Sequence, residues 1–253
     1  MNPPVSLQMW QPYGLSHWSL LGLTSVGAVL LVRLGRSHRG TAAADRFSRG
    51  FGLALFGVAF AWIGWNVLPG HLHADTSLPL HLCDVLRFVA GYALITRARW
   101  AVAATYYWGL TLDPQAMLTP SLVYSTVPAV DFTAYWLQHI LVVWSVFYLI
   151  WGLGERPTWR SYRIAVLLII GWAAGTFAIN LVLGADYGYL NRKPPMASLL
   201  DVFGPWPYYL LVEFIVALSL WALITLPWTL RKPRSAVTPA VDAVRIPGSE
   251  VLD

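Results

Sequence analysis

Seven long apolar runs, separated by short connections, dominate this chain of 253 residues, of which 57% are hydrophobic and only 11% charged. Each run is about long enough to cross 30 Å of hydrocarbon as an α-helix. The runs lie near residues 16–34, 50–68, 78–96, 98–113, 132–153, 161–184 and 206–230. The pattern therefore predicts an all-α, polytopic membrane protein built as a bundle of seven transmembrane helices.

The connections between the runs are alternately rich and poor in Lys and Arg. Every one of the 17 basic residues falls on one side of the predicted membrane, except Arg192 and Lys193 on the other side and Arg87 within a span. Short loops that carry Lys and Arg stay cytoplasmic. This bias places the N-terminus outside and the C-terminus in the cytoplasm, which requires an odd number of spans. We expect an integral membrane location with several spans.

The chain is expected to form one domain. Residues 1–230 make up the transmembrane bundle, and residues 231–253, with several prolines, are predicted to be a disordered cytoplasmic tail. Two outer connections stand out: residues 113–131 suggest a re-entrant or interfacial segment, and residues 184–207 a structured lid. No nucleic-acid-binding module is visible, and a single cysteine excludes an internal disulfide.

The third run carries three chemically active side chains on one helical face: Cys83, Asp84 and Arg87. A charge within a membrane needs a partner, so we expect Arg87 to pair with Asp84, one turn away, or with Glu213 in the last run. Two interpretations remain open. The pair is either a structural lock between helices or a clamp for a phosphate or carboxylate group.

The fifth run places Gln138 and His139 at about the depth of Cys83, in the outer half of the membrane. A thiol becomes a useful nucleophile when a neighbouring imidazole takes its proton and a third polar group orients that imidazole. Gln138, Asp113, Asn180 or Asp84 can serve as the orienting group. The alternatives are a cysteine that only packs and a histidine that only bonds another helix.

Histidines near Cys83 raise the alternative of a zinc site. His71, His73 and His81 precede Cys83 and Asp84, and imidazole, thiolate and carboxylate all bind zinc. No later run repeats histidine at ligand spacing, so the prediction includes no metal. His81 is instead expected to lie at the mouth of the site.

Several short motifs resemble the YwaF-type family of bacterial integral membrane proteins, which is related to a eukaryotic transmembrane ether-phospholipid acyltransferase. The resemblance covers most of residues 50–215, and residues 111–114 depart from it. The segments that carry it are 78–84 (LPLHLCD), 107–110 (YWGL), 115–120 (QAMLTP), Gln138-His139, Asn180, 187–194 and 204–209 (GPWPYY). The resemblance implies a membrane acyltransferase in which Cys83 takes the acyl group as a thioester and His139 is the general base.

These lines combine into one hypothesis: an acyltransferase or acyl hydrolase acting on glycerolipids in the outer half of the membrane, without metal, cofactor or nucleotide. Membrane lipids are the expected substrates. Substrate-binding residues would be His81, Arg87, Tyr189 and Lys193, and supporting polar residues Asp84, Asp113, Gln115, Gln138, Asn180 and Glu213. The competing hypotheses are a transporter or channel with a polar outer vestibule, a zinc-dependent membrane hydrolase, and a structural or signalling protein without turnover.

Overall fold

A computed structural model describes the chain except for residues 1–12, 75–76, 121, 123–126, 195–198 and 231–253. The predicted disordered tail lies outside the described residues. Seven α-helices and no strands occur in the described part, which confirms the all-α class. The helices are α1 (Leu15–Ser37), α2 (Ala42–Asn66), α3 (Leu82–Thr96), α4 (Arg99–Leu118), α5 (Pro128–Phe147), α6 (Trp159–Leu183) and α7 (Tyr208–Leu230). Shorter elements are the π-helical turn η2 (Tyr148–Leu153), which continues α5, and the 3₁₀ turns η3 (Tyr187–Tyr189) and η4 (Leu199–Phe203).

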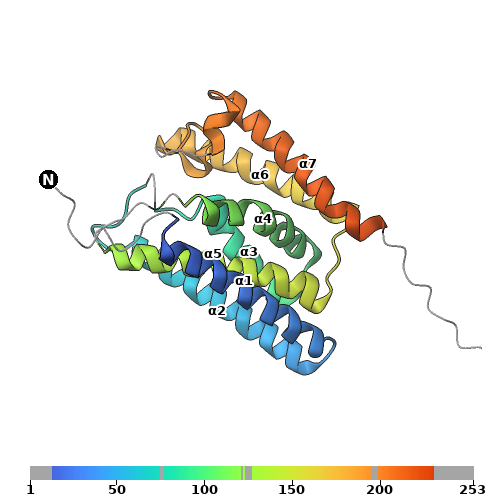
Figure 1. Ribbon diagram of the computed structural model, residues 1–253. Coiled ribbons are helices and arrows are strands. Elements are labelled where there is room, and N and C mark those ends of the chain that lie inside the picture. Colours follow the sequence, from blue (N-terminus) through green and yellow to red (C-terminus); the bar gives the residue numbers. More distant parts are fainter. Residues whose placement is uncertain (1–12, 75–76, 121, 123–126, 195–198, 231–253) are drawn as a thin grey trace, which may run out of the picture.

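The helices are arranged in layers (Figure 1). Helices α6 and α7 form one side, α3 and α4 lie in the middle, and α1, α2 and α5 form the other side. In the most apolar window of α5 with η2, 72% of the residues are buried, against 11–22% in α1, α2, α6 and α7. The segment from α5 to η2 is therefore the central helix of the bundle. The other four helices expose apolar side chains on the faces that point away from the bundle, as helices in contact with lipid do.

Five helices are long and apolar enough to cross a membrane: α1, α2, α5 with η2, α6 and α7. Helix α3 has 15 residues, which corresponds to about 22 Å and falls short of the hydrocarbon core. Both α3 and α4 are enclosed by the other helices, with Leu86, Ala90 and Tyr107 fully buried.

The C-terminal end of α4 differs from the prediction. Residues 113–118 are not part of a re-entrant segment but continue α4 as a helix, with Pro114 inside it. Pro120 has no N–H to bond the Ala116 carbonyl, and the hydroxyl of Tyr135 donates to that carbonyl instead at 2.6 Å. A bridge from α5 thus replaces the missing helical bond, and Asp113 lies on a helix rather than in a loop.

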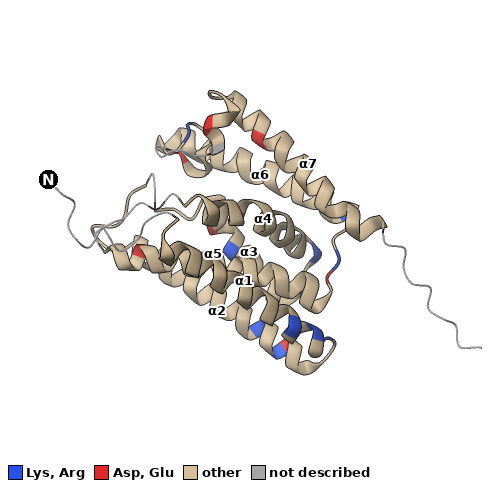
Figure 2. Ribbon diagram, in the orientation of Figure 1, with Lys and Arg blue, Asp and Glu red and all other residues tan. Residues whose placement is uncertain are grey.

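The opposite ends of the helices carry most of the basic residues (Figure 2). There Arg39 donates to the Gly152 carbonyl from Nε at 3.0 Å, and Arg36 to the Trp151 carbonyl at 3.1 Å. These two carbonyls belong to the last turn of η2 and lack helical partners, so the arginines stabilise that end. Arg97 also pairs with Asp45 at 2.7 Å and joins α3 to α2.

Candidate functional site

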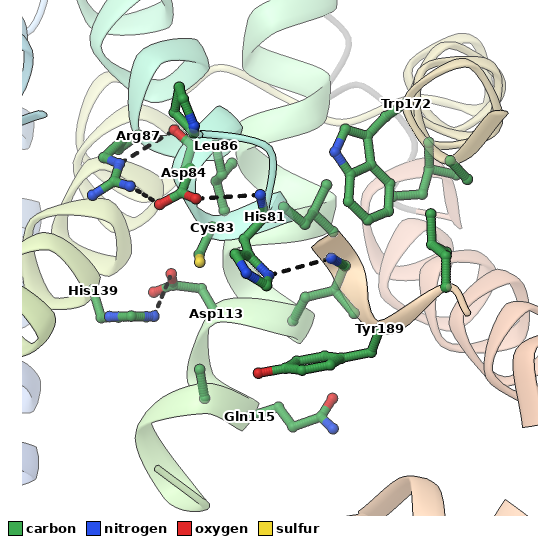
Figure 3. A pocket seen from close by; sticks show the side chains of 18 of the residues that line it. His81, Cys83, Asp84, Leu86, Arg87, Asp113, Gln115, His139, Trp172 and Tyr189 are labelled. Carbon is green, nitrogen blue, oxygen red and sulfur yellow. Dashed lines mark hydrogen bonds and ion pairs between the residues drawn. The ribbon is translucent and has the colours of Figure 1, made fainter. Parts of the chain in front are cut away.

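A cavity of about 860 Å³ lies in the half of the bundle away from the basic ends. Its walls come from α2 to α7 and from the connection after α6, and Figure 3 shows its polar part. Most of the predicted site residues line it: His81, Cys83, Asp84, Arg87, Asp113, Gln115, Gln138, His139, Tyr189 and Glu213. Cys83 and His139, which the sequence predicts to meet, both line this cavity.

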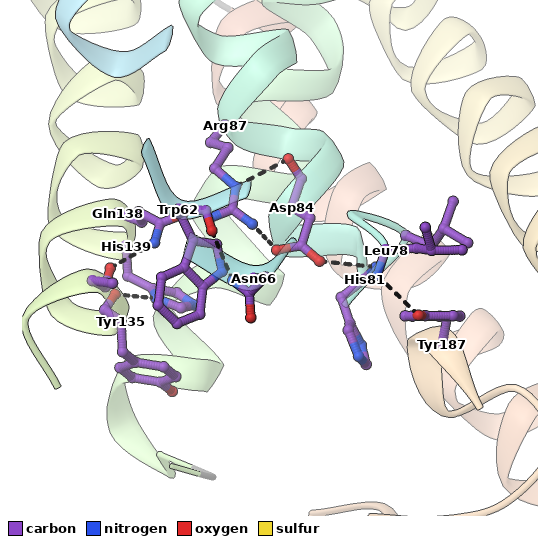
Figure 4. A network of polar contacts seen from close by, with 12 residues as sticks. Trp62, Asn66, Leu78, His81, Asp84, Arg87, Tyr135, Gln138, His139 and Tyr187 are labelled. Atoms are coloured by element: carbon purple, nitrogen blue, oxygen red, sulfur yellow. Dashed lines mark hydrogen bonds and ion pairs between the residues drawn. The ribbon is translucent and has the colours of Figure 1, made fainter. Parts of the chain in front are cut away.

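The first turn of α3 is built around Asp84, the third residue of the helix. Its carboxylate accepts the backbone N–H of His81, the N-cap residue, at 3.2 Å. This bond satisfies a donor that the helix start would otherwise leave unpaired. The same carboxylate forms an ion pair with Arg87 (Figure 4). Asp84 thus connects the helix cap to the buried cation.

Arg87 is 4% exposed and faces the interior, as predicted. Besides the ion pair, its Nε donates to the Asp84 carbonyl at 3.3 Å. Of the two expected partners, Asp84 is the one it binds, while Glu213 lies elsewhere in the cavity wall. Arg87 follows Cys83 by four residues, so the two residues lie on the same face of α3, one helical turn apart.

His139 is fixed by its own helix. Its Nδ1 lies 2.6 Å from the Tyr135 carbonyl, and a carbonyl only accepts, so Nδ1 carries the proton. In the neutral ring Nε2 is therefore the basic nitrogen. Nε2 lies 4.0 Å from Oδ1 of Asp113. The group that orients the ring is thus a backbone carbonyl. The sequence analysis considered only side chains for this role, because the positions of backbone carbonyls depend on the fold.

Asp113 lies between the two expected reacting groups. In Figure 3 the Cys83 sulfur points toward the Asp113 carboxylate, and the His139 ring approaches that carboxylate from another side. Asp113 is 3% exposed, and it reaches this position because α4 continues past Pro114.

Three buried polar atoms in this part of the cavity have no hydrogen-bond partner among the described residues. They are Oδ2 of Asp113, Oε1 of Gln138 and Nε2 of His139. Gln138 uses its Nε2 to donate to the Ala134 carbonyl at 2.9 Å. Buried polar atoms are nearly always paired, so three unpaired atoms in one cavity mark the place where polar groups of a ligand fit.

The connection between α6 and α7, predicted to be a structured lid, lines the cavity with Gly188, Tyr189, Leu190 and Pro194. The Tyr187 hydroxyl donates to the Ala74 carbonyl at 2.9 Å and accepts from the Leu78 N–H at 3.0 Å. The Gly188 N–H donates to Nδ1 of His81 at 3.2 Å. These bonds attach the connection to the chain just before α3, on which Cys83 lies.

Two predicted site residues do not line the cavity. Asn180 donates to the Tyr187 carbonyl at 2.9 Å and accepts from the Tyr187 N–H at 2.9 Å, so it supports the connection from behind. Lys193 lies 3.5 Å from Asp201 and 5.9 Å from the centre of the Tyr209 ring. The sequence could not reveal these contacts, because they involve the irregular connection between α6 and α7, whose course no residue pattern predicts.

Trp172 of α6 is a site residue that the sequence did not indicate. It lines the cavity, and its Nε1 donates to the Leu80 carbonyl at 3.0 Å, close to the start of α3. A tryptophan near a helix end is usually assigned to the membrane interface, and nothing in its spacing distinguishes Trp172 from such residues.

The histidines proposed for zinc do not converge. His71 packs edge-on against Trp65, with ring centres 4.7 Å apart, and Nδ1 of His81 accepts from Gly188. In the part of the chain that the structure describes, no group of three or more His, Cys, Asp or Glu side chains is arranged to hold a metal ion.

Comparison with known proteins places the chain in a family. The chain is 28% identical over 153 residues to an uncharacterized protein of Treponema pallidum (strain Nichols), a match that covers 58% of this chain and 60% of the relative. The chain thus matches less than two thirds of that relative's length. No solved structure matches.

The sequence model of the TMEM164 family matches residues 12–225. This match spans all seven helices up to Thr225 and includes every cavity residue named above. The more specific resemblance to YwaF-type proteins stays a prediction. Together with the five helices that can cross a membrane, the match shows that the chain is an integral, multi-pass membrane protein that belongs to the TMEM164 family.

Proposed function

We propose that the protein is a cysteine-dependent acyltransferase or acyl hydrolase that acts on glycerolipids from the outer half of the membrane. The observation that carries this proposal is the arrangement of Cys83, Asp113 and His139 in one buried cavity, with Nε2 of His139 4.0 Å from Asp113. A thiol, a base with a defined basic nitrogen and a connecting carboxylate are the parts that nucleophilic acyl transfer needs.

In the first step the thiol of Cys83 loses its proton. The Asp113 carboxylate takes up this proton and gives it to Nε2 of His139. The result is a thiolate and an imidazolium, and Asp113 is ionised again. The thiolate attacks the ester carbonyl of the lipid, the bond from that carbon to the glycerol oxygen breaks, and the imidazolium protonates the leaving oxygen. The products are a thioester on Cys83 and a lysolipid.

In the second step an acceptor hydroxyl, of a lipid or of water, gives its proton to Nε2 of His139. Its oxygen attacks the thioester carbonyl, and the Cys83 thiolate leaves and takes the proton back. Transfer to a lipid makes the protein an acyltransferase, and transfer to water makes it a hydrolase. The three unpaired polar atoms described above are the groups we assign to the acceptor.

Arg87 is assigned to charge stabilisation. Arg87 lies on the same face of α3 as Cys83, and Asp84 partly neutralises its charge. The remaining positive charge favours the thiolate and a lipid phosphate near it. The amides of Gln115 and Gln138 line the same cavity and are the donors we propose for the developing oxyanion. Lys193 already contacts Asp201 and is not assigned to the phosphate.

The proposal includes a membrane orientation. We infer that all seven helices run from one side of the membrane to the other, with the short α3 covering only part of the thickness among the longer helices. We also infer that the basic ends face the cytoplasm, which leaves the N-terminus outside and places the cavity in the outer half. The bacterial cytoplasmic membrane is the location we propose, consistent with the bacterial relative.

A conduit is disfavoured by the inner wall of the cavity. Its deep lining residues include Val142, Ile169, Ala217 and Trp221, which offer no polar path to the basic ends. An ion or proton route requires polar groups through the whole depth of the membrane.

The test is turnover of purified protein with phospholipids, followed as release of lysophospholipid. We expect Cys83→Ala to abolish release and His139→Ala to lower it by roughly 10² to 10⁴, the usual contribution of a general base. His38→Ala, at an exposed histidine outside the cavity, is the control and should retain the wild-type rate. Wild-type turnover in Cys83→Ala would overturn the proposal.

A further inference from the structure

The cavity has two chemically different parts. The polar part contains Cys83, Asp113 and His139, and the other part extends between α6 and α7 toward the basic ends. The lining of this second part is apolar and comprises Ile169, Ala173, Phe214, Ala217, Leu218 and Trp221. We call these six residues the apolar limb.

Small side chains keep the apolar limb open. Ala173 on α6 and Ala217 on α7 both line it, and their methyl groups leave room that larger side chains would fill. Along α7 the lining includes Glu213 at the polar end of the limb and is apolar from Phe214 to Trp221, a rise of about 10 Å along the helix axis.

Trp221 forms the inner end of the limb and is held firmly. It is 1% exposed, its Nε1 donates to the Thr111 hydroxyl at 3.0 Å, and its ring packs on Tyr107 with centres 5.5 Å apart. A large aromatic side chain with a fixed hydrogen bond makes a rigid wall.

The limb is also accessible from the side. Ile170 of α6 lines the cavity and is nevertheless 47% exposed, and the neighbouring Ala174 lines it and is exposed as well. In a membrane this side of α6 faces lipid, so an acyl chain can enter the cavity without passing through water.

We propose that the apolar limb holds the acyl chain being transferred and that Trp221 limits its length. The inference rests on the proposed function, since the carbonyl carbon of the chain must lie at Cys83 while the methyl end points to Trp221. The occupant is therefore a single fatty acyl chain of a glycerolipid, and its preferred length is set by the distance from the thiol to the tryptophan.

The energetic consequence is a graded preference. Because the chain enters from lipid and not from water, a methylene that fits gains only close packing against the side chains of the limb, and each one adds a small increment to the affinity. A methylene that meets the wall adds nothing and forces the side chains to move. Affinity should thus rise with chain length up to a limit and then fall.

The test measures non-covalent binding in a Cys83→Ala background, where no acyl group can be transferred. A mixture of saturated phosphatidylcholines of increasing chain length is added, and bound species are compared by native mass spectrometry. Ala217→Leu fills the limb one turn before the wall and should shift the preference to shorter chains. Trp221→Leu should shift it to longer chains.

Matched controls alter the same residue types outside the cavity. Ala178→Leu on an exposed position of α6 and Trp228→Leu on α7 should leave the preferred length unchanged. Opposite shifts in Ala217→Leu and Trp221→Leu support the inference, whereas an unchanged length profile in both folded variants overturns it. The binding measurement requires no turnover. If the acyl-transfer assay fails, the proposed function is therefore wrong, while the chain-length preference of the cavity can still be measured.

Discussion

Nε2 of His139 lies 4.0 Å from Oδ1 of Asp113, while Nδ1 of the same ring is held at 2.6 Å by the Tyr135 carbonyl. In the serine protease triad the carboxylate orients the imidazole from the nitrogen that does not contact the nucleophile. Here a backbone carbonyl orients the ring, and the carboxylate lies on the side of the basic nitrogen. Asp113 is therefore placed to pass a proton between Cys83 and His139 rather than to fix the ring.

Replacement of Asp113 by Asn keeps the size of the side chain but removes the group that carries the proton. We expect alkylation of Cys83 by iodoacetamide to slow by about tenfold or more near neutral pH. The rate should approach the wild-type value once the pH is high enough to ionise the thiol directly. Asp201→Asn, at a carboxylate outside the cavity, is the control. Equal rates for Asp113→Asn and wild type at every pH would remove Asp113 from the mechanism.

Variants of the buried ion pair between Asp84 and Arg87 allow its contribution to stability to be measured apart from its contribution to activity. Asp84→Ala leaves the Arg87 charge unpaired and should cost about 3 kcal/mol or more of stability, measured by thermal unfolding in detergent. The double variant Asp84→Ala/Arg87→Met removes both charges and should recover much of that loss.

The same double variant decides what Arg87 does. If Arg87 stabilises the thiolate and the phosphate, the double variant is folded but has lost lysophospholipid release. A folded double variant with wild-type release would show that the pair is only a structural lock, the alternative that the sequence left open.

The helices of this protein could be predicted, because a segment that crosses lipid must form a long apolar helix. Apolar length and the distribution of arginines indicated all seven helices, and helical spacing placed Cys83, Arg87 and His139 on faces that do meet in one cavity. These predictions depend only on the period of the helix and on depth in the membrane.

The irregular part could not be predicted in the same way. Pro114 and Pro120 indicated the end of a helix, yet α4 continues to Leu118, and Tyr135 bonds the carbonyl that Pro120 leaves unpaired. Asp113 therefore lies on a helix, which the two prolines did not indicate. The orientation of His139 depends on a backbone carbonyl, and the partner of Lys193 on the course of the outer connection.

The connection between α6 and α7 should loosen when Tyr187 becomes Phe. The change removes a donor from the Ala74 carbonyl and an acceptor from the Leu78 N–H, at a cost of about 1 to 3 kcal/mol. Hydrogen exchange should rise in residues 77–81 and 185–191. Tyr208→Phe, at a tyrosine that is 65% exposed, serves as the comparison, and equal exchange in the two variants would contradict the assigned role.

Chelators distinguish the thiol mechanism from a zinc hydrolase. The thiol and imidazole need no metal in the steps proposed, so lysophospholipid release should survive prolonged treatment with EDTA or phenanthroline. A zinc enzyme would lose activity and regain it on addition of Zn²⁺. Loss and recovery of that kind would favour the zinc alternative over the thioester route.

The most direct test of the central claim is the mass of the peptide that contains Cys83 after brief incubation of the protein with phospholipid. The account predicts an increase equal to one acyl group, which neutral hydroxylamine removes because a thioester is cleaved under those conditions, and which fails to accumulate in His139→Ala. An unmodified Cys83 during demonstrated turnover would contradict the account.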